Sequence, residues 1–262
     1  MPAPEGGGTA VDTIPQDDRR AAVVAALDTV LDPELDEPVT TMGFIEAIDL
    51  GEASVEITFR LPTFWCSANF AFLMASDMRC AVEQLPFIET ASVRLVDHFA
   101  AGKINRGVEA GLGFAAIFSG EAETDLDEIR QAFRERAFLG RQDRLLELLA
   151  ARIGVDATLA MTVADLVACS RHEEADVRGA ATRYFAMRRH EGAASAEAPA
   201  FVTLAGVAVA PAGYAAHRRM IRSVRAAAAA NAELCRIYLA ARRSHPVPGC
   251  GPEHRQDGGD DD

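Results

Sequence analysis

Cys66 is the residue whose type and position most clearly offer chemistry. It stands in the stretch Thr-Phe-Trp-Cys-Ser, between an expected strand and an expected helix, beside the chain's only tryptophan. The positive end of a helix dipole favours the thiolate, which is the form that binds metal or attacks an electrophile. The competing interpretation is a small buried hydrophobic side chain. Both interpretations remain open from the sequence.

Two carboxylates and one imidazole are the further candidate metal ligands. Asp32 and Glu34 flank Pro33, where a helix must stop, so an Asx turn is the alternative role for Asp32. His98 follows the last expected strand of the first half, and it is the weakest of the candidate metal ligands. We expect Asp32 and Glu34 near the same end of the domain as Cys66. A thiolate with hard carboxylate oxygens is a mixed ligand set suited to transient iron binding.

The elements that must position these residues form an expected α/β domain over residues 19–118. Apolar spacing predicts helices from Arg19 to Pro33 and over 70–85. Alternation over 54–61 predicts a half-buried strand, which pairs with 44–50 in a hairpin. A third strand is expected at 91–98. This order predicts a short sheet with helices on one face.

The second half changes character and is predicted to be mainly helical over residues 119–243. Its expected helices cover about 124–152, a short segment capped at Thr162, part of 173–190, and 211–243, with a small hairpin near 201–210. The arginines of the last helix are expected to form its solvated face. Residues 1–18 and 244–262 are predicted to be a disordered arm and a disordered acidic tail. The apolar stripes of this half should pack on each other and on the first domain.

Composition excludes several classes of protein. A net charge of −13 argues against nucleic-acid binding, which needs a basic surface. Apolar stretches are too short to span a bilayer, and the N-terminus lacks the features of a signal peptide, so we expect a cytoplasmic protein. Five cysteines with irregular spacing make no disulfide framework. In a reducing compartment they are thiols or metal ligands.

The order of these features resembles a known family, the metal–sulfur cluster assembly domain of PaaD and SufT-like proteins. The resemblance covers about residues 19–113: a first helix, the acidic motif at Asp32 to Glu34, Gly43-Phe44, a hairpin, and the loop Cys66. In the family that cysteine is the residue proposed to handle iron or clusters. The sequence departs from the family in having Ser67 where proline is usual, and bulky Phe64 and Trp65 in the loop.

The resemblance implies a maturation factor that handles transient iron or an iron–sulfur cluster and is not an ordinary enzyme. PaaD-like members accompany multicomponent di-iron oxygenases, so the implied client is an oxygenase component. Other cluster assembly proteins are the alternative partners, and the expected oligomeric state is a homodimer. One cysteine cannot complete the four-ligand set of a stable cluster. Two alternatives stay open: an adaptor or assembly chaperone in which Cys66 is structural, and a cysteine-dependent enzyme with Cys66 as nucleophile and His98 as base.

Overall fold

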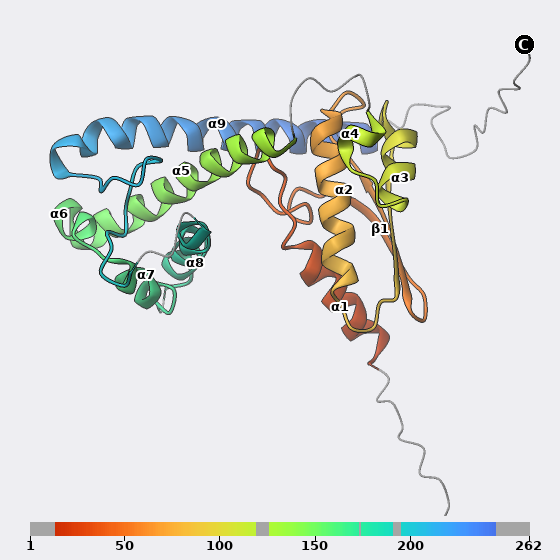
Figure 1. Ribbon diagram of the computed structural model, residues 1–262, viewed down its shortest axis with the longest axis horizontal. Helices are drawn as coiled ribbons and strands as arrows, with labels where there is room; N and C mark the ends of the chain where they lie inside the picture. Colours follow the sequence, from red (N-terminus) through yellow and green to blue (C-terminus); the bar gives the residue numbers. More distant parts are fainter. Residues whose placement is uncertain (1–13, 119–125, 173, 191–194, 245–262) are drawn as a thin grey trace, which may run out of the picture.

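The computed structural model describes residues 14–118, 126–172, 174–190 and 195–244. Two groups of elements lie apart in Figure 1, an α/β half and a helical half, and the long helix α9 (Pro211–Ser244) runs along both. The predicted arm at residues 1–13 and tail at 245–262 fall outside the described residues. Among the described residues, no helix combines the length and apolarity needed to cross a membrane.

The α/β half is built on a three-stranded sheet in the order β1-β2-β3. Strands β1 (Ile45–Leu50) and β2 (Ser54–Arg60) are antiparallel, as the predicted hairpin requires. Strand β3 (Thr90–Val96) pairs with β2 in parallel. A parallel pair needs a crossover connection, and helix α2 (Ala68–Glu83) supplies it. The loop that carries Cys66 is the first part of that crossover.

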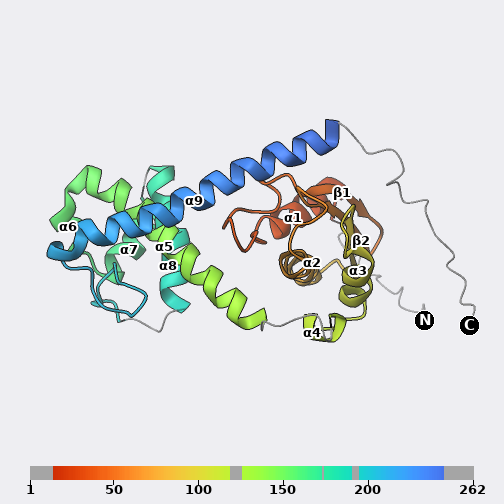
Figure 2. The same cartoon turned by 90° about the horizontal axis from the view of Figure 1, so that it is seen from above.

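One face of the sheet is covered by helices. On β2, Val55, Ile57 and Phe59 are buried and alternate with exposed Ser54 and Glu56, so only one face meets the core. Helices α1 (Gln16–Leu27) and α2 lie against that face, as Figure 2 shows. Short helices α3 (Ala101–Glu109) and α4 (Phe114–Ile117) complete this half. The predicted fold class is confirmed.

The first helix begins earlier than the sequence analysis placed it. It starts at Gln16 rather than Arg19, directly after Pro15, which serves as the N-cap residue. Asp17 and Asp18 fall in the first turn, where negative charge is favourable beside the positive end of the helix dipole. These residues were assigned to the arm because they continue a polar, proline-containing segment without apolar periodicity.

The second half is helical, as predicted. Helix α5 (Leu126–Ile153) is followed by α6 (Val155–Leu159), α7 (Val163–Cys169) and α8 (Ala175–His190). Thr162 caps α7 in a capping box with Asp165, so that prediction is confirmed. In place of the hairpin expected near 201–210, an isolated bridge joins Val202 and Ala208.

The core of the helical half contains a buried polar network. Gln142 and Asp143 of α5 are fully buried. The Gln142 amide donates to the Tyr184 hydroxyl at 2.9 Å. Arg218 and Arg225 of α9 both pair with the Asp143 carboxylate. From the sequence, we expect the arginines of the last helix on a solvated face. For Arg218 and Arg225 this expectation is wrong, because both side chains form ion pairs with the buried Asp143 of α5.

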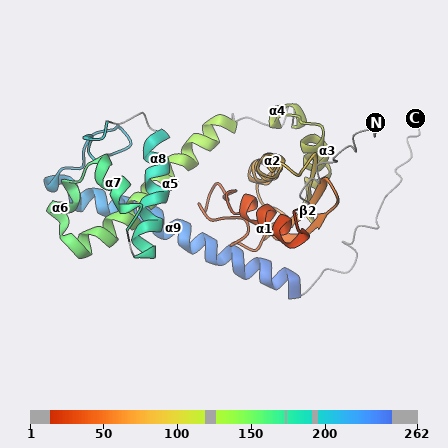
Figure 3. The same cartoon turned by 90° about the horizontal axis from the view of Figure 1, so that it is seen from below.

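Helix α9 joins the two halves. Its first part packs against α5, and Ile221 is buried in the core of the helical half. Its second part contributes Ala232 and Leu239 to the core of the α/β half. Arg243, near its end, donates to the Gly43 carbonyl at 2.7 Å and to Glu46 at 2.8 Å. Figure 3 shows α9 passing along the α/β half, so the predicted packing of the second half onto the first is confirmed.

Candidate functional site

Cys66 lies at the N-terminus of a helix, as the sequence predicts. Ser67 is the N-cap residue of α2, which begins at Ala68. The thiol is half-buried, and its Sγ lies 3.3 Å from the Thr63 Oγ1. The unpaired amides at the start of a helix carry partial positive charge. The thiol is partly accessible to a ligand or partner.

His98 holds the backbone of the Cys66 loop. The imidazole is 5% exposed, and its Nε2 lies 2.8 Å from the Cys66 carbonyl oxygen. Its Nδ1 accepts a hydrogen bond from the Ala100 amide at 3.2 Å, so Nε2 carries the proton. Burial, opposed by the bond to Cys66, lowers the pKa of His98, and the charge of Arg242 lowers it further. Both ring nitrogens are engaged by backbone groups, and this geometry gives no support to a Cys66–His98 nucleophile and base pair.

Asp32 forms the Asx turn that the sequence left open. Its Oδ1 accepts hydrogen bonds from the amides of Glu34 and Leu35, each at 2.9 Å. The side chain is buried, and burial raises its pKa to about 6, opposed by those two amide bonds and aided by the negative charge of Glu34. Asp32 thus shapes the acidic turn, which we define as residues 32–37. The ligand role predicted for it remains a prediction.

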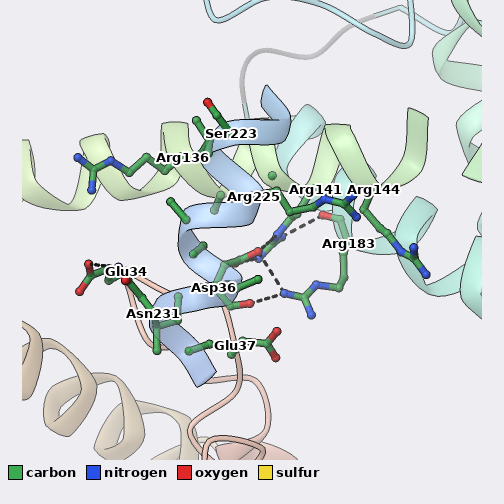
Figure 4. Close-up of a pocket in the computed structure, with 18 of the residues that line it drawn as sticks. Glu34, Asp36, Glu37, Arg136, Arg141, Arg144, Arg183, Ser223, Arg225 and Asn231 are labelled. Carbon is green, nitrogen blue, oxygen red and sulfur yellow. Dashed lines mark hydrogen bonds and ion pairs between the residues drawn. The ribbon is translucent and has the colours of Figure 1, made fainter. Parts of the chain in front are cut away.

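Glu34 faces the other half of the chain. Its Oε1 accepts a hydrogen bond from the Asn231 amide of α9 at 3.2 Å, as Figure 4 shows. This contact joins α9 to the acidic turn.

Cys235 is a residue of this region that the sequence analysis did not select. It lies one turn after Asn231 and packs, half-buried, against the same core as Cys66. Burial is the main cause that raises the pKa of Cys235 to about 11. The nearby Asp32, Cys66 and Glu34 side chains act in the same direction. Only the tertiary structure shows that the helix face with Cys235 is turned toward the α/β half.

The acidic turn is also clamped to the helical half. Asp36 has a positive φ of 56° and presents its carboxylate to α5 and α8. Arg141 donates to both carboxylate oxygens, at 2.8 Å to Oδ2 and by a second short bond at 2.6 Å to Oδ1, and Arg183 lies 3.1 Å away. A cavity of about 570 Å³ lies between the turn, α5, α8 and α9. Figure 4 shows Asp36 and the two arginines at this junction.

Phe64, Trp65 and Phe99 form an aromatic patch, and the first two of these residues directly precede Cys66 in the sequence. Trp65 is 76% exposed and Phe99 50% exposed. Their rings stack at 5.9 Å, and Phe64 meets Trp65 edge-on at 4.9 Å. The Phe99 amide donates to the Phe64 carbonyl at 3.2 Å, which ties the two loops together. Exposed clusters of large apolar side chains commonly mark interaction sites.

The ligands present do not form a closed metal cage. Among the residues that the structure describes, no three side chains of His, Cys, Asp or Glu gather into a group that could hold a metal ion.

These features define a class of protein: a small α/β module with a loop thiol at a helix N-terminus and an acidic turn, extended by a helical half. Residues 20–95 match the family described as iron-sulfur cluster assembly protein. The match lies in the N-terminal part, confirms the resemblance seen in the sequence, and connects this part of the chain with iron–sulfur cluster assembly. Comparison with curated proteins gives no match.

Proposed function

We propose that this chain is a maturation factor that receives iron or an iron–sulfur cluster at Cys66 and passes it to a client protein. The observation that carries the proposal is the position of Cys66, half-buried before α2 within the segment that matches the assembly family. A thiolate there would bind iron, and Glu34 is the carboxylate that we propose as a further ligand.

The open ligand set supports transfer rather than storage. Stable clusters are held by four cysteine thiolates, and the described part of this chain gathers no such group. A cargo bound by few ligands keeps coordination positions for the thiols of another protein. Exchange can then proceed by replacement of one thiolate at a time, without a change of oxidation state.

The aromatic patch is the proposed contact with the client. Cargo leaving Cys66 must pass to a protein that lies against the Cys66 loop, and Trp65 is the adjoining residue. Aromatic side chains are enriched among residues that dominate binding energy at interfaces. As a finer proposal, the client is a component of a multicomponent di-iron oxygenase, which rests on the resemblance to PaaD-like proteins alone.

Anaerobic reconstitution with iron and sulfide tests the proposal. Wild-type protein, Cys66→Ser and Cys169→Ser are compared by visible absorbance and by iron and sulfide analysis after desalting. Cys169 is the matched control, because it is a half-buried thiol in the helical half. The proposal expects the wild type and Cys169→Ser to retain iron and Cys66→Ser to lose it. Equal retention by all three proteins would refute it.

A second candidate function is an adaptor in which Cys66 is structural. The observation that favours it is an exposed apolar stripe on α9, where Leu234, Ile237 and Tyr238 are about half exposed. A stripe at this spacing fits a partner helix. The same reconstitution separates the two functions, since an adaptor retains no iron and tolerates Cys66→Ser.

A further inference from the structure

One face of α9 lies over both chemical parts of the α/β half. Asn231, Cys235, Leu239 and Arg242 follow at spacings of four, four and three residues, so they share a helix face. Asn231 bonds to Glu34 at 3.2 Å, and Leu239 is buried in the α/β core. Cys235 lies between these contacts and is the thiol of this face.

The far end of the same face contacts the residues that flank the Cys66 loop. Arg242 donates to the Leu61 carbonyl and to the Asp97 carbonyl, both at 2.9 Å. Leu61 opens the loop that leads to Cys66, and Asp97 precedes the His98 that bonds to the Cys66 carbonyl. The Cys66 loop is therefore held against α9.

Helix geometry places Cys235 between the acidic turn and that loop. With a rise of 1.5 Å per residue, Cys235 lies about 6 Å along the axis from Asn231 and about 10 Å from Arg242. Both Cys235 and Cys66 are half-buried against the same apolar core. The two thiols come from segments 169 positions apart in the sequence and pack against one core.

We propose that Cys235 is the second thiol ligand of the Cys66 site, so that iron carried by this chain is bound by two sulfurs, one from the α/β module and one from α9. The inference rests on the proposed function and extends it to the helical half. The ligand class is a thiophilic divalent metal or the iron of a cluster. Binding is ligand exchange: each thiol releases its proton and donates a sulfur lone pair, and no electron is transferred.

Anaerobic Co²⁺ titration of the full chain tests this inference. All proteins carry Cys250→Ser, because Cys250 lies outside the described residues. The readout is the sulfur-to-cobalt charge-transfer absorbance, which reports thiolate ligands. Substitution of a residue that only supports a metal ligand lowers metal affinity by roughly tenfold or more. Loss of a ligand itself should lower the affinity at least as much. Cys235→Ser and Cys66→Ser should each weaken Co²⁺ binding by about tenfold or more, with a weaker band, and Cys169→Ser should match the parent.

The outcomes separate this inference from the proposed function. If Cys66→Ser weakens binding and Cys235→Ser does not, the second thiol is refuted and the proposed function stands. If neither variant weakens binding, both fail. Dibromobimane, which fluoresces after it joins two neighbouring thiols, gives a metal-free measurement on the same proteins. We expect fluorescence in the parent and in Cys169→Ser, and its loss in either site variant; equal signals in all four would overturn the pairing. Circular dichroism verifies that each variant is folded.

Discussion

The two halves of the chain differ in where their buried polar side chains lie and in what these side chains bind. In the α/β half the core is apolar, and among its described residues the buried polar side chains are Asp32 and His98, which both belong to the candidate site. In the helical half, buried Gln142 and Asp143 lie in the core itself and bind side chains of α8 and α9. Buried polar groups in the first half thus orient the loops that offer ligands. In the second half they fix how helices pack.

The two halves therefore contribute to the candidate site in different ways. A buried network is satisfied in few helix arrangements, because an unpaired buried polar group is costly. The helical half therefore holds α9 in one position, and α9 carries Asn231 and Cys235 to the acidic turn. The α/β half supplies the half-buried thiol of Cys66 and the exposed ring of Trp65. The following predictions test the comparison, from the largest expected effect on stability to the smallest.

Asp143→Ala should destabilise the protein most. The Asp143 side chain is fully buried and pairs with Arg218 and with the Arg225 Nε at 2.6 Å. Removing one partner of a buried ion pair costs about 3 kcal/mol. Urea denaturation measures this loss. Glu233→Ala, which removes an exposed pair with Arg236, is the control and should cost less than about 0.5 kcal/mol. Equal losses for the two variants would contradict the contrast.

Asp36→Ala should loosen the junction between the halves. The variant loses the ion pairs with Arg141 and Arg183 and places alanine at a φ of +56°, for a total of about 2 kcal/mol. Asp36→Gly loses the same pairs without the backbone penalty, because glycine accepts positive φ, so it should lose less. Both are measured by urea denaturation at low and high salt. A salt-independent difference from the wild type would rule out the clamp.

Tyr184→Phe tests the neutral part of the buried network. The hydroxyl donates to the Ala200 carbonyl at 3.0 Å and accepts from Gln142 at 2.9 Å. Its loss should lower the free energy of unfolding by about 1 kcal/mol. Tyr238→Phe is matched in chemistry on an exposed ring and should leave the thermal midpoint unchanged. A midpoint for Tyr184→Phe equal to that of Tyr238→Phe would mean that the network adds no stability.

Of these variants, Trp65→Ala should change the stability of the protein least and the transfer of cargo to the client most. The ring is 76% exposed, so the free energy of unfolding should shift by less than about 0.5 kcal/mol. If the aromatic patch contacts the client, transfer of cargo to that client slows while iron binding by the chain is retained. Val207→Ala, a 63% exposed side chain in the helical half, is the control. Unchanged transfer in Trp65→Ala would assign the patch no part in docking.

The α/β half was predictable because its signals are local. Alternation at Val55, Ile57 and Phe59 reports one buried face, and Pro86 closely follows the end of α2. Helix α1, in contrast, ends at Leu27, before the stop predicted at Pro33. Cys66 at the start of a helix follows from the same local order. The position of Cys235 was not predictable, since the direction of a helical stripe depends on which neighbour it meets. Asp143 gave no signal for a similar reason: its partners lie 75 and 82 positions later in the sequence.

Transfer of a loaded cluster tests the central claim most directly. The chain is reconstituted anaerobically, desalted and mixed with an apo-ferredoxin as acceptor, and native mass spectrometry follows both proteins. The account predicts that the wild type and Cys169→Ser lose the mass of the cluster as the acceptor gains it, whereas Cys66→Ser carries nothing to transfer. A Cys66→Ser protein that loads and delivers the cluster at the wild-type rate would contradict it.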